Sequence, residues 1–460
     1  MSQKQNIAEA FGNTQNDNAA TTLKSNSDFQ INKLMISDAG CAAFKELSTA
    51  GVITNPNEWF LYATSADVRK KAEGLFSPEN ISYTGDLNPH FGEGAGQNLD
   101  RGLLLAKLAW QKGNLQKIVL EMDTRSKITH VFMFAGGGSS FPVTNLVTKN
   151  LKAATSKSID LSSMLEDDAV IDMESLILGF KKYGILVTIV VPSGAEPKKT
   201  ENYIEGLNSL LYDGDIYNPK VSYNLIKVDD MASSTDATLG LADILNIAAT
   251  KFAITNMVIK KFYTSESIEG TDLDESEILN AIDSGGEFIV GQGRGVDISA
   301  AYADFDRGFK TFNTAATIKG ASNVLALFEY PKGFARGSQE ILAETRMVEK
   351  LNSSTGMPNS PAIVKHAITI GDVTQPTISL LYCGINAESK RADNARVELL
   401  SLAKGAGEQL LRDIKVTEGI TDTAPGLNRS EASFLREASK RALTGTPVPG
   451  DELKIAALAA

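Results

Sequence analysis

A glycine-rich turn between two apolar segments is the feature of this sequence that most directly suggests chemistry. The stretch HVFMFAGGGSSFPVTNLV joins a strand-like run to a helix-like run through Gly136, Gly137, Gly138, Ser139 and Ser140. Bare backbone N–H groups at the start of a helix attract anions, so such a turn can hold a phosphate. The chain contains no GxxxxGK[ST] motif and no GxGxxG motif, which excludes the common P-loop and dinucleotide fingerprints.

An acidic segment, TDLDESEILNAI, contains the second set of candidate reactive groups, Asp272, Asp274 and Glu277. A carboxylate can orient and activate a water molecule by general-base assistance. Acidic residues are also favoured at the N-terminus of a helix, so the same segment fits a solvated helix start.

Alternating strand-like and helix-like segments predict the framework that positions these groups. Strand-like runs include QINKLMIS, EWFLYATS, HVFMFAG, ILVTIVVPSG and SYNLIKVDD, with helical patterns between them. The alternation predicts an α/β domain with a doubly wound, mostly parallel sheet over residues 29–236. Its ligand should lie at the carboxyl ends of the strands, where the loops DAGC, ATSAD, GEGAGQN, AGGGSS, PSGAEPKK and VDD occur.

The rest of the chain predicts four further segments. A helix pattern that is apolar nearly all round, from about 237 to 263, indicates a buried central helix, which leads into the acidic loop ending at residue 274. Residues 275–388 show the strands and helices of a second, smaller α+β domain, and residues 389–460 form a helical and polar tail. Residues 1–28 are rich in Asn, Gln, Ser and Thr, which predicts a disordered arm.

The composition narrows the class of protein. The 460 residues carry a formal net charge of −11, which disfavours a direct, general nucleic-acid binder. Two cysteines, Cys41 and Cys383, allow no disulfide framework or zinc spacing, and the three scattered histidines suggest no metal cluster. No apolar run is long enough to span a bilayer and no signal-peptide pattern is present, so the sequence predicts a cytoplasmic protein.

The order of loops and domains resembles that of the tubulin/FtsZ superfamily over about residues 30–390. GEGAGQN is similar to the family's loop over the γ-phosphate, and AGGGSS is similar to its GGGTG[ST]G signature. Weaker matches, DAGC, ATSAD, PSGAE, LIKVDD and LGLADIL, fall in family order around them. The resemblance implies nucleotide-binding roles for Gly40, Cys41, Asp67, Gly94, Ala95, Gly96, Asn98, Gly136, Gly137, Gly138, Ser139, Ser140, Glu196, Asp230 and Asp243.

The same resemblance implies GTP or GDP as the ligand, together with Mg²⁺. Asp243 would accept from N1–H and the exocyclic amine of guanine. Asp274 and Glu277, with Asp272 nearby, fall on the acids that family members project onto the nucleotide of the next subunit. It therefore implies a head-to-tail homopolymer in which assembly switches on GTP hydrolysis.

Several positions depart from the family pattern. Phe141 and Pro142 stand where the signature has glycines, and Leu239 replaces a stacking aromatic residue. These departures keep open a second hypothesis, a structural or regulatory filament protein with little or no GTP turnover. A third hypothesis is a dinucleotide-dependent enzyme on an unrelated Rossmann-type fold, which the absence of GxGxxG disfavours.

The charge expected near the phosphates is also displaced. The family arginine maps to Thr200, although Lys198 or Lys199 could carry the positive charge. The C-terminal GDELKIAALAA is not a convincing match to the adaptor-recruiting peptide of division proteins. We therefore expect a role in positioning or segregating DNA or phage rather than in a division ring. The tail could recruit an adaptor protein, nucleic acid would be reached only indirectly, and no direct membrane contact is expected.

Overall fold

The computed structural model of the protein describes residues 29–53, 55–112, 114–155, 183–191, 197–213, 216–227, 241–268, 273–312, 318–355 and 362–385. The chain divides into two units, and every described residue belongs to the first, Met1–Ile385. The predicted N-terminal arm and the predicted tail from residue 389 lie outside the described residues.

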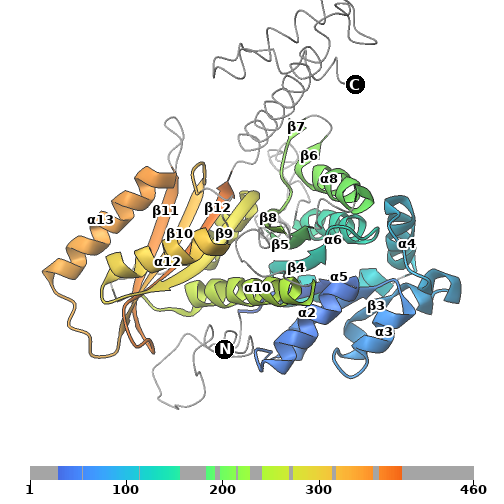
Figure 1. Ribbon diagram of the computed structural model, residues 1–460, viewed down its shortest axis with the longest axis horizontal. Coiled ribbons are helices and arrows are strands. Elements are labelled where there is room, and N and C mark those ends of the chain that lie inside the picture. The colour runs from blue at the N-terminus through green and yellow to red at the C-terminus, as the bar shows by residue number, and fades with distance from the viewer. Residues whose placement is uncertain are drawn as a thin grey trace, which may run out of the picture. The chain divides into compact units, whose positions relative to one another are not determined.

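Within the described residues, ten strands form one mixed, mostly parallel sheet in the order β11-β10-β12-β9-β8-β5-β4-β1-β2-β3 (Figure 1). The strands are β1 (Asn32–Ile36), β2 (Trp59–Ala63), β3 (Ile81–Tyr83), β4 (Ile128–Phe134), β5 (Gly184–Val191), β8 (Ser222–Lys227), β9 (Gly286–Arg294), β10 (Asn323–Pro331), β11 (Ile363–Gly371) and β12 (Thr377–Ile385). A separate hairpin consists of β6 (Tyr212–Asp213) and β7 (Ile216–Tyr217). The predicted α/β fold class is confirmed.

The first half of the sheet, β3-β2-β1-β4-β5-β8, is parallel throughout. Its strand order matches a doubly wound domain, because β2 and β3 follow on one side of β1 and β4, β5 and β8 follow on the other, so that the strand order reverses between β1 and β4. β5 is buried at all eight positions of GILVTIVV, as the unbroken apolar run predicts for the centre of a parallel sheet. A ligand of this half is therefore expected where the carboxyl ends of β1 and β4 lie side by side.

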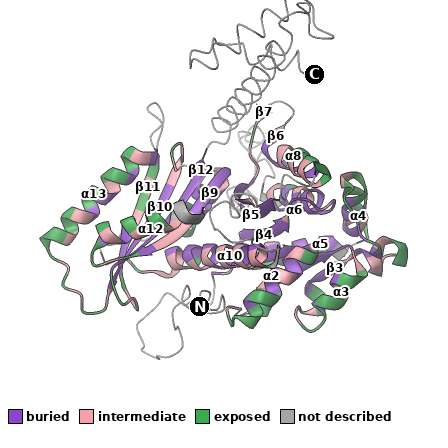
Figure 2. Ribbon diagram, in the orientation of Figure 1, coloured by how far each residue is buried: buried purple, intermediate pink, exposed green. Residues whose placement is uncertain are grey.

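Helices cover both faces of the sheet (Figure 1). The helices are α2 (Ser37–Thr49), α3 (Ala66–Ala72), α4 (Leu99–Gln111), α5 (Asn114–Arg125), α6 (Ser140–Thr155), α8 (Pro197–Leu211), α10 (Leu241–Thr264), α11 (Glu275–Asp283), α12 (Ile298–Phe312) and α13 (Ser338–Thr355). α2 and α10 pack on one face through an aromatic cluster that includes Phe44, Phe132 and Phe252. α6 packs between α4 and α8, and Figure 2 shows how burial concentrates in the strands between the helical layers.

The second half of the sheet continues from the first without a break. β8 pairs with β9 in parallel through Ser222–Gly286 and Tyr223–Glu287, and β12 then pairs antiparallel with β9 and β10. α10 contributes to the core of both halves, because Phe252 belongs to the first cluster and Phe262 to the next one. These two contacts explain why the sequence of α10 is apolar nearly all round the helix.

Three elements add detail to the sequence expectations. The stretch between the GEGAGQN loop and β4 forms two helices, α4 and α5. β3 has only three residues, too few for a period-two pattern to stand out. Helix α11 begins directly after Asp274, as the interpretation of the acidic segment as a helix start allows, and its first turn contains Glu275 and Glu277.

Candidate functional site

Two serine hydroxyls meet beside the carboxyl ends of β1 and β4, where the strand order reverses. Ser37 follows β1 and starts α2. Its φ of +60° is a left-handed backbone conformation that residues other than glycine rarely adopt. Its Oγ lies 3.0 Å from the Oγ of Ser139, which belongs to the glycine-rich turn after β4. This contact joins the two loops where a doubly wound sheet binds its ligand.

The rest of the first loop is built into the core. Gly40 lies against the backbone of Met35, and the Cys41 side chain belongs to the apolar cluster beneath α2. Burial raises the pKa of the Cys41 thiol, which keeps it protonated. Only the backbone of Cys41 could therefore take part in ligand binding.

The triple-glycine turn approaches a second glycine loop so closely that a side chain would not fit. Gly138 N–H donates to the carbonyl of Gly96 over 3.0 Å. A Cβ on Gly138 would lie 2.4 Å from the carbonyl oxygen of Asn98, whereas one on Gly137 would make only an ordinary contact with Ser140. Gly137 is also the only partly exposed residue in the turn, so it faces the available space. The Ser140 hydroxyl donates to the carbonyl of Phe134 and fixes the start of α6.

The loop over this turn is held in an unusual backbone conformation. Gly94 and Gly96 have φ values of +86° and +61°, which glycine adopts without strain. Ala95 between them is buried, and the Asn98 side chain accepts from Arg101 N–H to cap α4. A conformation of this kind directs successive N–H groups towards one point, as in anion-binding nests.

The turn between β2 and α3 adjoins the same loop. Ser65 forms an isolated β-bridge with Glu93, one residue before Gly94. Ser65 also caps α3 by accepting from Asp67 N–H, and the Asp67 side chain is exposed in the first turn of that helix. Five of the six strand-end loops expected from the sequence have described residues, PSGAEPKK only from Pro197 onward, and the four that precede it converge through α2, α3, α4 and α6.

Helix α8 is hydrogen-bonded to both glycine loops. Asn202, which is buried, donates to the carbonyl of Gln97 over 3.0 Å and to that of Gly136 over 3.4 Å. This anchor places the first turn of α8 over the triple-glycine turn. Neither Asn202 nor Ser37 is part of the sequence-predicted site, because no short motif marks them.

The two predicted acids that the structure describes, Asp274 and Glu277, lie at the opposite edge of the sheet. α11, which begins after Asp274, reaches the amino ends of the strands: Ser222 at the start of β8 donates to the carbonyl of Ile282, and Gly184 at the start of β5 faces the Ile282 side chain. The glycine loops lie at the carboxyl ends of the same strands. One subunit therefore cannot bring both sets together.

Known structures with this arrangement decide the fold. An empty FtsZ dimer from M. jannaschii matches with a TM-score of 0.52 and 16% identity, over 79% of this chain and 90% of that one. A GTPγS-bound CetZ2 protofilament from Haloferax volcanii matches with a TM-score of 0.54 and 15% identity, over 80% and 99%. A GTPγS-form TubZ protofilament from Bacillus thuringiensis serovar israelensis matches with a TM-score of 0.52 and 14% identity, over 79% and 90%.

The chain has the tubulin/FtsZ fold. No protein-family model matches the sequence, and a search of curated proteins finds no relative. The likeness is therefore one of fold, and it is carried by the arrangement of elements.

Two of the predicted catalytic acids, Asp274 and Glu277, make contacts within their own subunit. Asp274 is exposed, and its Oδ1 accepts from the Ser276 hydroxyl over 2.7 Å and from Glu277 N–H over 2.8 Å. These hydrogen bonds lower the pKa of Asp274, with the Ser276 bond contributing most. Glu277 forms an ion pair of 2.8 Å with Lys365 of β11, and Asp272 lies outside the described residues.

The remaining predicted residues are placed only in part. Asp243 lies in the first turn of α10 and is half-buried, beside Ile244, which packs in the same cluster as Cys41. Glu196 and Asp230 lie outside the described residues. Among those that are described, no group of three His, Cys, Asp or Glu side chains could hold a metal ion, and no helix combines the length and apolar character needed to cross a membrane.

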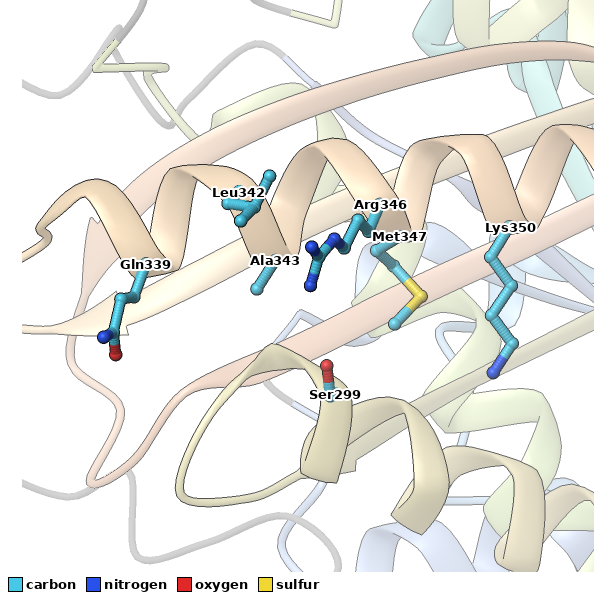
Figure 3. Close-up of a pocket in the computed structure, with 7 residues that line it drawn as sticks. All are labelled: Ser299, Gln339, Leu342, Ala343, Arg346, Met347 and Lys350. Atoms are coloured by element: carbon cyan, nitrogen blue, oxygen red, sulfur yellow. The ribbon is translucent and has the colours of Figure 1, made fainter.

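A separate hollow of about 480 Å³ lies between α12 and α13 (Figure 3). Its lining residues are Ser299, Gln339, Leu342, Ala343, Arg346, Met347 and Lys350. None of the residues predicted from the sequence belongs to it, so we do not connect it with the nucleotide site.

Proposed function

We propose that this chain binds a guanine nucleotide, polymerises head to tail and hydrolyses GTP where two subunits meet. The observation that carries the proposal is the convergence of the β1, β2 and β4 loops with the Gly94–Gly96 loop, where Ser37 and Ser139 share a hydrogen bond. This is the place where sheets with this strand order bind nucleotides. The neighbours that share the fold include GTPγS-bound protofilaments.

The residues at this place fit the phosphates of a nucleotide. The hydroxyls of Ser37 and Ser139 and the N–H groups around Gly94 and Gly96 are donors suited to phosphate oxygens. The open space at Gly137 and Gly96 leaves room for a ligand to approach the backbone.

Mg²⁺ would contribute charge stabilisation of the transferred phosphate. Mg²⁺ typically keeps several waters and takes few protein ligands beside substrate phosphates. A site without a group of three described metal-binding side chains is compatible with this mode, and the exposed Asp67 is its candidate carboxylate.

The separation of the acids from the glycine loops supports assembly as the switch for hydrolysis. A contact that joins the acid-bearing edge of one subunit to the loop-bearing edge of the next is heterologous and does not close, so it generates a filament. Asp274 would then reach the nucleotide of the neighbouring subunit. The Asp274 side chain is exposed, so its carboxylate would orient a water molecule at that contact.

A second candidate is a filament protein with weak or no hydrolysis. The Asp274 hydrogen bonds and the Glu277–Lys365 ion pair favour it, since a carboxylate with a lowered pKa is a weaker general base. In either case, we propose that the filament positions or segregates DNA or phage through an adaptor, with a division-ring role as the alternative.

Negative-stain microscopy with GTP, with GDP and without nucleotide tests the proposal. We expect filaments with GTP and Mg²⁺, and a phosphate-release rate that rises more steeply than linearly with protein concentration. Filaments without phosphate release would favour the second candidate. A protein that neither binds guanine nucleotide nor forms filaments would refute both.

A further inference from the structure

The hollow of about 480 Å³ between α12 and α13 combines apolar and positively charged side chains. Figure 3 shows Arg346 and Lys350 pointing from α13 towards α12, from which Ser299 faces them. Leu342, which also lines the hollow, is 48% exposed, and its neighbour Ile341 is 46% exposed. Adjoining apolar side chains that are left in water beside polar ones are typical of a surface that another protein covers.

The positive charge of the hollow is not balanced by its own lining, because none of the lining residues is acidic. Within the part of the chain that the structure describes, no ion pair joins Arg346 or Lys350 to a carboxylate, and the Nζ of Lys350 lies 4.1 Å from the centroid of the Tyr302 ring. The buried Glu344 of the same helix is already bound by Arg336. The hollow is therefore a cationic place on a chain whose net charge is −11, and it suits an acidic partner.

Two stretches of the sequence could supply the opposite charge. Residues 160–178 and 266–287 each contain at least six acidic residues and no Lys or Arg. The second stretch is partly engaged in its own subunit, because its Glu277 and Asp283 form ion pairs with lysines of β11 and α6. The first stretch joins α6 to β5 and lies outside the described residues. Its acidic residues are Asp160, Glu166, Asp167, Asp168, Asp172 and Glu174.

The first stretch also carries large apolar side chains among its acids. It reads DLSSMLEDDAVIDMESLIL, in which Met164 and Leu165 directly precede three consecutive acidic residues. The hollow offers the matching groups, since Leu342 and Met347 line it together with the two cations. Charge and apolar character therefore both favour residues 160–178 as the occupant of the hollow.

We propose that the hollow between α12 and α13 binds the acidic segment 160–178 of a second copy of this chain. The inference rests on the proposed function only in taking a second copy as the partner, since the contact itself requires no nucleotide. The hollow belongs to the second half of the sheet, whereas the segment is joined to the first half between α6 and β5. A contact between two different surfaces is heterologous and can be repeated from copy to copy, so it would reinforce or link filaments.

Charge reversal on the two sides tests the contact. The hollow variant is Arg346→Glu with Lys350→Glu, and the segment variant is Asp167→Lys with Asp168→Lys. Sedimentation velocity without nucleotide follows each variant alone and an equimolar mixture of the two, at low and at high salt. We expect either variant alone to self-associate at least about tenfold more weakly than the unsubstituted chain, as the loss of charged contacts implies. Mixing the two should restore association, because each then meets the opposite charge on the other, and high salt should weaken it again.

The matched control is Lys107→Glu with Lys117→Glu, at exposed positions of α4 and α5, which changes the net charge by the same amount as the hollow variant. This control should self-associate as the unsubstituted chain does. A loss of association in the control equal to that in the hollow variant would overturn the inference, because net charge alone would then explain the effect.

Three further results separate the inference from the proposed function. If the hollow variant associates normally, or if mixing restores nothing, the inference fails although filaments formed with GTP would uphold the proposed function. If mixing restores association and GTP produces no filaments, the inference stands and the proposed polymerisation fails. If the unsubstituted chain stays monomeric without nucleotide and forms no filaments with GTP, both fail together.

Discussion

Asp274 is both the N-cap of α11 and the acid proposed to act on a neighbouring nucleotide. As a cap it accepts from Glu277 N–H, and its side chain is exposed. Asparagine is about as good an N-cap as aspartate, whereas alanine is not. Substitution by these two residues therefore separates the structural role from the chemical one.

We expect Asp274→Ala to lower the free energy of unfolding by about 1 kcal/mol, and Asp274→Asn to lower it much less. Both should reduce GTP hydrolysis about a hundredfold, because each removes the carboxylate that assists the water. Urea denaturation and phosphate release measure the two effects. Glu275→Gln, on the next residue, is the matched control and should change neither. Full hydrolysis by Asp274→Asn would exclude a chemical role for Asp274.

Ser37 combines a left-handed backbone with a hydroxyl contact. At φ +60°, glycine is unstrained whereas alanine pays a steric cost of roughly 1 kcal/mol. We therefore expect Ser37→Gly to be more stable to urea than Ser37→Ala, the reverse of the usual order in a helix. Nucleotide affinity should fall in both, since both lose the hydrogen bond to Ser139. Equal stabilities of the two variants would argue against the left-handed conformation.

At the scale of elements, α10 is fastened to the sheet by a buried histidine. His130 of β4 donates from Nδ1 to Asn256 Oδ1 over 3.0 Å and accepts the Thr188 hydroxyl on Nε2 over 2.9 Å, and its ring stacks on Phe252. The tautomer follows because Oδ1 can only accept. Burial lowers the pKa of His130 to about 3, opposed by the bond to Asn256 and reinforced by the charge of Lys33.

This histidine makes stability depend on pH. Below the ordinary histidine pKa of about 6.5, His130 binds a proton in the unfolded chain but not in the folded one. The stability that the neutral His130 contributes is therefore complete above that pH and is lost as the pH falls towards about 3. The free energy of unfolding should therefore fall with decreasing pH, with a slope that approaches about 1.4 kcal/mol per pH unit at about pH 5.5. His130→Gln should flatten the urea-denaturation slope measured from about pH 7 to pH 5. His90→Gln removes an exposed histidine and should not.

The packing of the two glycine loops gives another element-scale prediction. Gly138→Ala places a methyl group 2.4 Å from the Asn98 carbonyl oxygen and 2.7 Å from its nitrogen, so the loops must separate. We expect GTP affinity to fall at least about tenfold, because one loop can no longer be positioned by the other. Gly137→Ala makes only ordinary contacts within the chain and should leave the free energy of unfolding within about 0.5 kcal/mol of that of the unsubstituted chain, although its methyl group enters the space proposed for the phosphates. Urea denaturation therefore distinguishes the two variants, since only Gly138→Ala should be clearly destabilised.

Local patterns predicted the elements whose signals lie within a few residues. The apolar run of β5 and the triple-glycine turn after β4 are such signals, and both lie where the doubly wound interpretation expects them. The contact of Ser37 with Ser139 is different, because it joins residues 102 positions apart in the sequence. The hydrogen bonds of Asn202 to the carbonyls of Gln97 and Gly136 likewise join distant segments, and no spacing in the sequence encodes them.

At the scale of the whole described unit, the length of α10 separates the proposed nucleotide site from the proposed catalytic acid. Asp243 lies in its first turn, and the acidic segment follows its last. Its 24 residues span about 36 Å at the rise of an α-helix, far beyond the reach of any side chain. A catalytic contact between Asp274 and a nucleotide beside Asp243 therefore needs two molecules, and a polymer is the simplest way to form it repeatedly.

This requirement can be tested by following phosphate from one kind of subunit only. Asp274→Asn subunits are loaded with γ-labelled GTP, freed of excess nucleotide, and mixed with unsubstituted subunits that carry GTPγS. The subunits that carry the labelled GTP lack the Asp274 carboxylate, so labelled phosphate can appear only if a neighbouring unsubstituted subunit provides it. We expect release on mixing and none from Asp274→Asn alone. Co-sedimentation of the two proteins without labelled phosphate would show that the acid does not act between subunits.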